Sequence, residues 1–117
     1  MGGDYYDFVR NNEQEVAICI ADVSGKGISA ALIMSNFQAN MHVLLHRAES
    51  LASLVQDLNI KVNDMAKGER FITLFVAKYN LSTRILTYVN AGHNPPLLLS
   101  KDGSVSMLKV GCTGLGM

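Results

Sequence analysis

The sequence predicts an α+β domain in which antiparallel strands precede two helices and further antiparallel strands follow them. Short apolar runs rich in β-branched residues occur near both ends of the chain, whereas residues 28–67 show helical periodicity without glycine or proline. This order packs the helices together on one face of a sheet. At 117 residues, the chain forms one domain that is large enough to bury a core without disulfides or structural metals.

The first two strands are expected to form a hairpin. Residues 5–9 (YYDFV) and 16–21 (VAICIA) are mostly apolar, and the polar segment between them contains two asparagines suited to a turn. Pairing of the two strands would return Asp22 to the neighbourhood of Asp4.

Two amphipathic helices should follow the glycine-rich segment 24–27 (SGKG). The first is expected from Ile28 to Arg47, and the second begins after Ser50 as N-cap and ends at Lys67 and Gly68. The apolar stripe of the first helix is predicted to comprise Leu32, Ile33, Phe37, Met41, Leu44 and Leu45, and that of the second Leu51, Leu54, Val55, Leu58, Val62 and Met65.

The remaining strands form two further hairpins. Residues 71–79 (FITLFVAKY) predict a strand buried on both faces, and the alternating residues 84–92 predict its partner. Residues 97–108 contain two short strands around a Lys-Asp-Gly turn. The glycine-rich tail 110–117 is interpreted as the approach to a further element that the chain lacks.

Composition excludes several classes of function. Ten basic residues balance ten acidic ones, and neither sign forms the run or stripe that binds nucleic acid or anionic membranes. Cys19 and Cys112 lie far apart and are interpreted as free thiols in a reducing compartment. No segment is apolar over the ~20 residues of a membrane span, and no signal peptide begins the chain, so a cytoplasmic location is expected.

Two aspartates are candidates for a metal site. Asp22 ends a buried strand, and the predicted hairpin brings Asp4 beside it, so the two could supply the oxygen ligands that hard divalent cations prefer. Asp7 could ligate or orient a bound water. In the alternative interpretation, Asp22 and Ser24 only cap the following helix, and Asp4 and Asp7 are exposed charges at a strand end.

Two nucleotide-binding motifs fail. A phosphate loop of the Walker type needs glycine where Ile20 stands, and Lys26 is followed by Gly27 instead of serine or threonine. The GGDEF motif of nucleotide cyclases fails because tyrosines follow the initial Gly-Gly-Asp.

The histidines offer weaker candidates. His42 and His46 have a spacing that can hold zinc, but no glutamate follows His42, and a surface or half-buried pair explains them as well. His93 lies in a loop with Pro95 and Pro96, where it could bind phosphate or act as a general acid, or simply hydrogen-bond the backbone of a turn.

Four stretches together carry a family resemblance. They are GGDYYDFV (2–9), ICIADVSGKGISAALIMS (18–35), FITLFVAKYNLSTRILTYVNAGHNPPLLL (71–99) and GCTGLGM (111–117). In this order and spacing, the chain closely resembles the bacterial stage-II-sporulation-E and sigma-regulator-type serine phosphatases, a branch of the PPM (PP2C-like) metal-dependent protein phosphatases.

The resemblance implies an α-β-β-α sandwich of antiparallel sheets flanked by helix pairs, with a binuclear Mn²⁺ or Mg²⁺ site. Asp22 is then similar to the carboxylate that bridges both metals, the Val23 carbonyl to a further ligand, and Asp4 to the ligand of the second metal. Asp7, Gly25 and His93 would lie around the metals or on the substrate side. Such a metal pair activates water for attack on phosphorus, so no protein nucleophile is needed. The expected substrate is phosphoserine or phosphothreonine on a regulatory protein of the anti-anti-sigma type, in a partner-switching pathway.

The chain also departs from the family pattern. It lacks the later TDG segment with its metal aspartate, and the segment that precedes GGD in the family; the acids that do not match ligand positions are Glu49, Asp57, Asp64, Glu69 and Asp102. Residues 1–117 are therefore expected to be a central part of a phosphatase domain, incomplete at both ends and weakly active or inactive alone. Open sheet edges would favour a homodimer or aggregation. The alternative is a non-catalytic pseudo-phosphatase module that binds a regulatory protein.

Overall fold

The computed structural model describes residues 4–25, 27–47, 50–66, 70–94, 96–108, 111–112 and 114–115. The predicted α+β class and the order of elements are confirmed. The elements are β1 (Asp4–Arg10), β2 (Glu15–Val23), α1 (Ile28–Arg47), α2 (Leu51–Ala66), β3 (Ile72–Asn80), β4 (Leu86–Ala91), β5 (Leu97–Leu99), β6 (Val105–Met107) and β7 (Gly111–Cys112).

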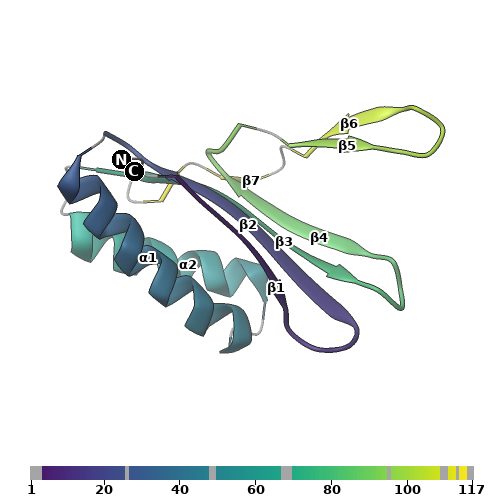
Figure 1. Cartoon of the computed structure of the whole chain (residues 1–117), viewed down its shortest axis with the longest axis horizontal. Helices are drawn as coiled ribbons and strands as arrows, with labels where there is room; N and C mark the ends of the chain where they lie inside the picture. The colour runs from purple at the N-terminus through teal and green to yellow at the C-terminus, as the bar shows by residue number, and fades with distance from the viewer. Residues whose placement is uncertain are drawn as a thin grey trace.

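One five-stranded sheet organises the molecule. Its strand order is β1-β2-β3-β4-β7, with antiparallel pairing from β1 to β4 and parallel pairing of β7 with β4. Both helices cover the same face of this sheet, whereas the separate β5–β6 hairpin projects on the other side (Figure 1). None of the helices in the described ranges is long and apolar enough to cross a membrane.

The core lies between the helices and the sheet. Alternate residues of β2 face the helices and are buried, and three of them, Ala17, Cys19 and Ala21, are small enough to let the helices approach closely. Cys19 is a free thiol, and burial raises its pKa to about 11, so it packs as an apolar group. The side chain of Cys112 lies outside the described residues.

The helix predictions hold with one correction. The stripe of α2 is buried except for the half-buried Met65, and the Ser53 N–H donates to Ser50 Oγ at 3.1 Å, which confirms the N-cap. The predicted C-cap, Lys67 and Gly68, lies outside the described residues. Leu32 of α1 was assigned to the buried face wrongly, because 66% of it is exposed. The buried face instead follows Ala30, Met34, Phe37, Met41 and Leu45, and Leu32 points about 200° away from Ala30.

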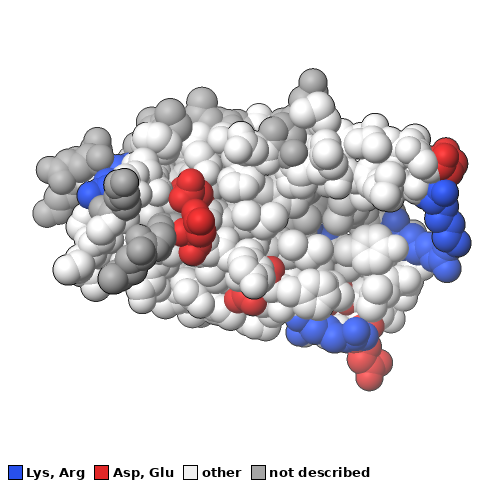
Figure 2. Space-filling view, turned by 45° about the horizontal axis from the view of Figure 1, so that its top comes forward, with Lys and Arg blue, Asp and Glu red and all other residues white. Residues whose placement is uncertain are grey.

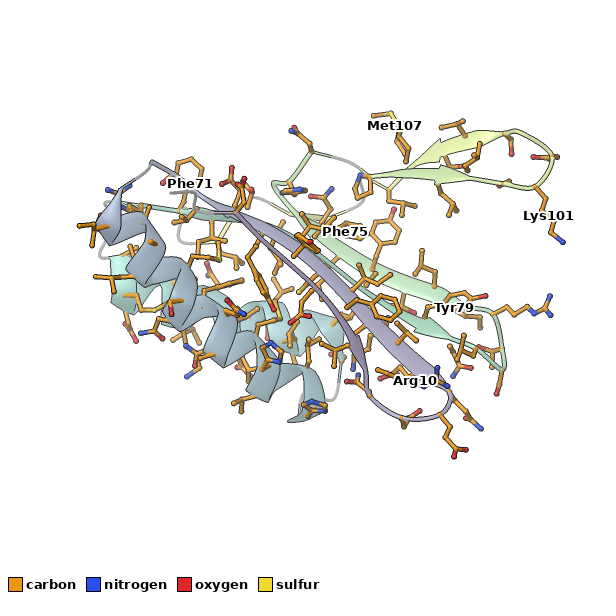
Figure 3. The ribbon with its side chains drawn as sticks, viewed as in Figure 1. Arg10, Phe71, Phe75, Tyr79, Lys101 and Met107 are labelled. Atoms are coloured by element: carbon orange, nitrogen blue, oxygen red, sulfur yellow. The ribbon has the colours of Figure 1, made fainter. Side chains whose placement is uncertain are left out.

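The other face of the sheet is apolar and partly open. A groove of about 570 Å³ runs between this face and the β5–β6 hairpin, and its lining includes Phe8, Phe75, Tyr79 and Leu98. Phe75 and Tyr79 are labelled in Figure 3. Seen from the hairpin side, most of the surface carries no charge (Figure 2). Residues 74–77 of β3 are all buried, as expected for a strand covered on both faces.

The glycine-rich tail contributes to the sheet. Gly111 pairs with Asn90, and a Cβ at position 111 would lie 1.6 Å from the Asn90 carbonyl oxygen, so only glycine allows this approach. Farther on, Leu115 and Ile72 exchange two backbone hydrogen bonds of 3.0 and 2.7 Å. The sequence pattern predicted no strand in this tail, because it contains no run of β-forming residues.

Candidate metal centre

Asp4 and Asp22 meet at one end of the sheet. They are directly paired residues of β1 and β2, and residues paired in this way project from the same face. This confirms the expectation that the hairpin returns Asp22 to Asp4. The face is the one opposite the helices, because the neighbours of Asp22 along β2, Ala21 and Val23, are buried in the helix-side core.

The Asp4 carboxylate disfavours the ionisation of Asp22. Burial raises the pKa of Asp22, a hydrogen bond and the negative charge from Asp4 raise it further, and His93 acts in the opposite direction. Placing two acidic side chains at one spot is unfavourable unless a proton or a cation is shared between them. The set of donors therefore fits a hard divalent cation, which is coordinated by carboxylate and carbonyl oxygens.

The backbone adds an oxygen on the same side. The Ser24 N–H donates to the Phe71 carbonyl at 2.8 Å, so in the antiparallel ladder the next pair, Val23 and Ile72, is not hydrogen-bonded. Ile72 uses its backbone groups for Leu115. The carbonyl of Val23 therefore points away from β3 toward the β1 side, where Asp4 lies.

His93 reaches this site through Thr73. Thr73 is the residue of β3 that pairs with Asp22. The Thr73 hydroxyl lies 3.2 Å from His93 Nδ1, and it donates a long hydrogen bond of 3.5 Å to the backbone carbonyl of Asp22. The backbone N–H of His93 donates to Asn90 Oδ1 at 2.8 Å. The side-chain amide of Asn90, which is buried, donates to the Leu108 carbonyl at 3.1 Å. The backbone of the loop is thus fixed by Asn90, and the imidazole lies near enough to Asp22 to lower the pKa of its carboxyl.

Sequence reasoning missed Thr73 and Asn90. Neither lies beside a charged residue along the chain, and each acquires its role only through strand pairing across some 50 residues for Thr73 and through the turn before His93 for Asn90. For Asn90, the sequence offered one signal. An asparagine near the end of a predicted strand can be buried, and a buried side-chain amide needs a hydrogen-bond partner.

Ser24 does not cap the helix. Its hydroxyl accepts a hydrogen bond of 2.9 Å from the Phe71 N–H, and its own N–H is bonded to Phe71 as well, so Ser24 extends the pairing of β2 with β3. Helix α1 instead begins with the Ala31 N–H bonded to the Gly27 carbonyl at 3.1 Å. The capping alternative is therefore wrong for Ser24. Gly25, which follows, has a φ of 81° that favours glycine.

Asp7 lies elsewhere. Being three residues from Asp4 in a strand, it faces the helices, where the Tyr5 hydroxyl donates to it at 2.9 Å and His42 Nε2 lies 2.7 Å away. Burial opposes its ionisation, but the hydrogen bonds from Tyr5 and the Phe8 N–H, with the charge of His42, outweigh it and hold the pKa of Asp7 below its usual value. The structure therefore does not bring Asp7 together with Asp4 and Asp22.

Two acidic side chains are all that this centre contains within the described ranges. No group of three His, Cys, Asp or Glu side chains in these ranges could hold a metal ion, and this applies to His42 and His46 as well. Asp57 and Asp64 lie on α2 and Asp102 in the β5–β6 turn, while Glu49 and Glu69 are outside the described residues.

Comparison with known sequences identifies the family. Residues 12–117 match the family described as stage II sporulation protein E (SpoIIE). The chain is 41% identical over 101 residues to the phosphoserine phosphatase RsbU of Bacillus subtilis, an alignment that covers 86% of this chain and 30% of RsbU. The chain thus spans less than a third of the length of this curated relative.

Solved structures share the fold. The PP2C phosphatase domain of SpoIIE from Bacillus subtilis superposes with a TM-score of 0.84 at 17% identity, over 98% of this chain and 34% of that one. RsbX, crystallised in complex with magnesium, superposes with a TM-score of 0.78 at 21% identity, over 100% of this chain and 56% of that one. The sheet with its two covering helices is therefore a PP2C-type fold, and the chain belongs to the stage II sporulation protein E (SpoIIE) family.

Proposed function

We propose that the protein is a metal-dependent phosphatase that hydrolyses phosphoserine or phosphothreonine on another protein. The observation that carries this proposal is the pairing of Asp4 with Asp22 at one end of the sheet, in a chain of the SpoIIE family. The similarity to RsbU, a phosphoserine phosphatase, supports the choice of phosphoserine.

In this proposal, the carboxylates of Asp22 and Asp4 and the carbonyl of Val23 would hold Mn²⁺ or Mg²⁺ ions, with Asp22 as the ligand common to both. The magnesium bound by RsbX supports a divalent cation of this kind. When bound, the ions supply charge stabilisation for the phosphoryl oxygens and an activated water. No protein nucleophile is required, and the residues of this chain orient the reacting groups.

His93 serves the substrate side. Its Nδ1 faces the Thr73 hydroxyl, which leaves Nε2 to bind a phosphoryl oxygen or to give a proton to the departing serine oxygen. We also assign Gly25, in the loop that follows β2, to the surroundings of the metals.

The domain extends beyond these residues in our proposal. Two carboxylates and a carbonyl are too few for a tight binuclear site, so residues 1–117 form part of a phosphatase domain and are weakly active or inactive alone. The substrate is a regulatory protein of the anti-anti-sigma type in a cytoplasmic partner-switching pathway.

Hydrolysis of a phosphoserine peptide with Mn²⁺, by a parent protein that contains the complete domain, tests the proposal. Asp22→Asn is expected to lower kcat/KM at least 100-fold, whereas Asp57→Asn, an exposed change on α2, should leave it unaltered. Full activity of Asp22→Asn would overturn the assignment of this residue. A wild-type parent protein that binds the peptide with Mn²⁺ present but never hydrolyses it would instead establish the pseudo-phosphatase alternative.

A further inference from the structure

Arg70 forms a hydrogen bond with the loop that follows β2, the strand that carries Asp22. It lies just before β3, and its Nη1 donates a hydrogen bond of 2.7 Å to the carbonyl of Ser24, two residues after Asp22. Figure 3 shows its neighbour Phe71 at this end of the sheet. No carboxylate of the described residues forms an ion pair with Arg70, so the guanidinium is committed to a backbone oxygen.

This bond replaces one that the ladder has lost. In regular antiparallel pairing, the Ser24 carbonyl would accept the Phe71 N–H, because the Ser24 N–H already donates to Phe71. The Ser24 hydroxyl accepts that N–H instead, and the freed carbonyl turns to Arg70. Arg70 therefore fixes the direction in which the chain leaves β2, immediately after Val23.

Gly25 is shaped around Arg70. A Cβ at position 25 would lie 1.8 Å from Arg70 Nη1 and 3.1 Å from its Cζ, so no other residue fits while the arginine keeps its place. A side chain at position 25 would therefore have to displace the guanidinium from the Ser24 carbonyl. The direction of the Ser24 carbonyl and the lack of a side chain at position 25 thus both depend on the Arg70 guanidinium.

We propose that Arg70 is a positioning residue for the metal centre: by holding the Ser24 carbonyl, it orients the Val23 carbonyl and the Asp22 carboxylate toward the cation. It does not touch substrate, because it lines a surface pocket with Ser29, Ile33 and Met65 of the two helices, and Asp22 projects from the opposite face. This inference rests on the proposed metal-dependent function.

The interaction has the strength that such a role needs. A hydrogen bond from a charged donor is roughly twice as strong as a neutral one, and it is shielded here because the bond is partly buried. Without it, the loop samples other directions, and cation binding must first restore the productive one. Lost preorganisation lowers metal affinity even when the fold is intact.

Calorimetric titration with Mn²⁺ tests the proposal, with circular dichroism as the check on folding. Arg70→Ala is expected to weaken Mn²⁺ binding about tenfold, and Arg70→Lys should recover part of the loss because it keeps the charge. Arg10→Ala is the matched control: Arg10 also donates to a backbone carbonyl, that of Glu13 at 2.8 Å, but in the β1–β2 turn. Wild-type Mn²⁺ affinity in Arg70→Ala would overturn the proposal.

Amide exchange without metal separates this inference from the proposed function. In EDTA, Arg70→Ala should speed exchange of the Ser24 and Phe71 amides at least tenfold relative to wild type and Arg10→Ala. Unchanged exchange would refute the positioning role even if the protein is a phosphatase. Accelerated exchange in a protein that binds no Mn²⁺ would retain Arg70 as the anchor of the loop but refute its role at a metal centre, together with the proposed function.

Discussion

Replacing Asp22 by asparagine should stabilise the metal-free protein. The carboxylates of Asp4 and Asp22 belong to directly paired residues, and like charges in that position destabilise a sheet by about 0.2–1 kcal/mol. Both residues are exposed, so water screens the repulsion, and we expect a gain of about 0.5 kcal/mol. Asparagine keeps the volume of the side chain and removes the charge.

The pH dependence has a defined sign. Burial and Asp4 raise the pKa of Asp22 in the folded protein, so the folded state holds its proton more tightly than the unfolded state. The stability that this provides is present below the unfolded pKa of about 4 and is lost as pH rises through the folded pKa. Asparagine does not titrate, and the advantage of Asp22→Asn should therefore develop as pH rises from 4 to 7.

Urea unfolding in EDTA at pH 7 measures the effect. With a slope of about 1.5 kcal/mol per molar urea, 0.5 kcal/mol moves the midpoint up by about 0.3 M. Asp4→Asn should give the same shift, the double variant little more, and Asp57→Asn none. Saturating Mn²⁺ should reverse the order, because it stabilises a protein that binds it. A lower midpoint for Asp22→Asn in EDTA would refute the argument, since it would mean that the carboxylate forms a stabilising contact.

Three further predictions concern other parts of the chain. Asp7→Asn should lower the free energy of unfolding at pH 7 by about 0.5–1.5 kcal/mol, since it weakens the bonds to Tyr5 and His42. Because folding lowers the pKa of Asp7, this difference in stability between wild type and variant should vanish in acid unfolding curves as pH falls through that pKa. Gly111→Ala should cost about 1–3 kcal/mol in urea unfolding, because the new Cβ collides with the Asn90 carbonyl and separates β7 from β4. Light scattering should detect a dimer or larger assembly formed through open sheet edges, and a clean monomer would contradict that expectation.

Local patterns were sufficient for most of the fold. The hairpin of β1 and β2 and the cap at Ser50 depend on contacts within about 20 residues, and sequence periodicity records such contacts well. The error at Leu32 has a physical cause: apolar residues surround much of α1, so the sequence alone does not define which side faces the sheet.

The surroundings of the candidate site were less predictable. Arg70 and Thr73 act through the pairing of β3 with β2, which joins residues about 50 positions apart and leaves no local pattern. The position of Asp7, by contrast, could have been predicted from the sequence. Strand residues three apart point to opposite faces of the sheet, so Asp4 and Asp7 could not serve one site. Alternation, applied to the motif itself, would have assigned Asp7 to the helix side.

Strand β2 shows how the fold accommodates an unfavourable site. Its helix-facing residues are small and buried under α1, and they provide the packing that keeps the strand in place without any cation. At its end, the same strand carries Asp22 opposite Asp4, a pair that opposes folding unless positive charge is supplied. The stabilising and the destabilising halves lie on opposite faces, so substitutions at the carboxylates should change stability and metal binding in opposite directions, whereas substitutions in the core should lower both.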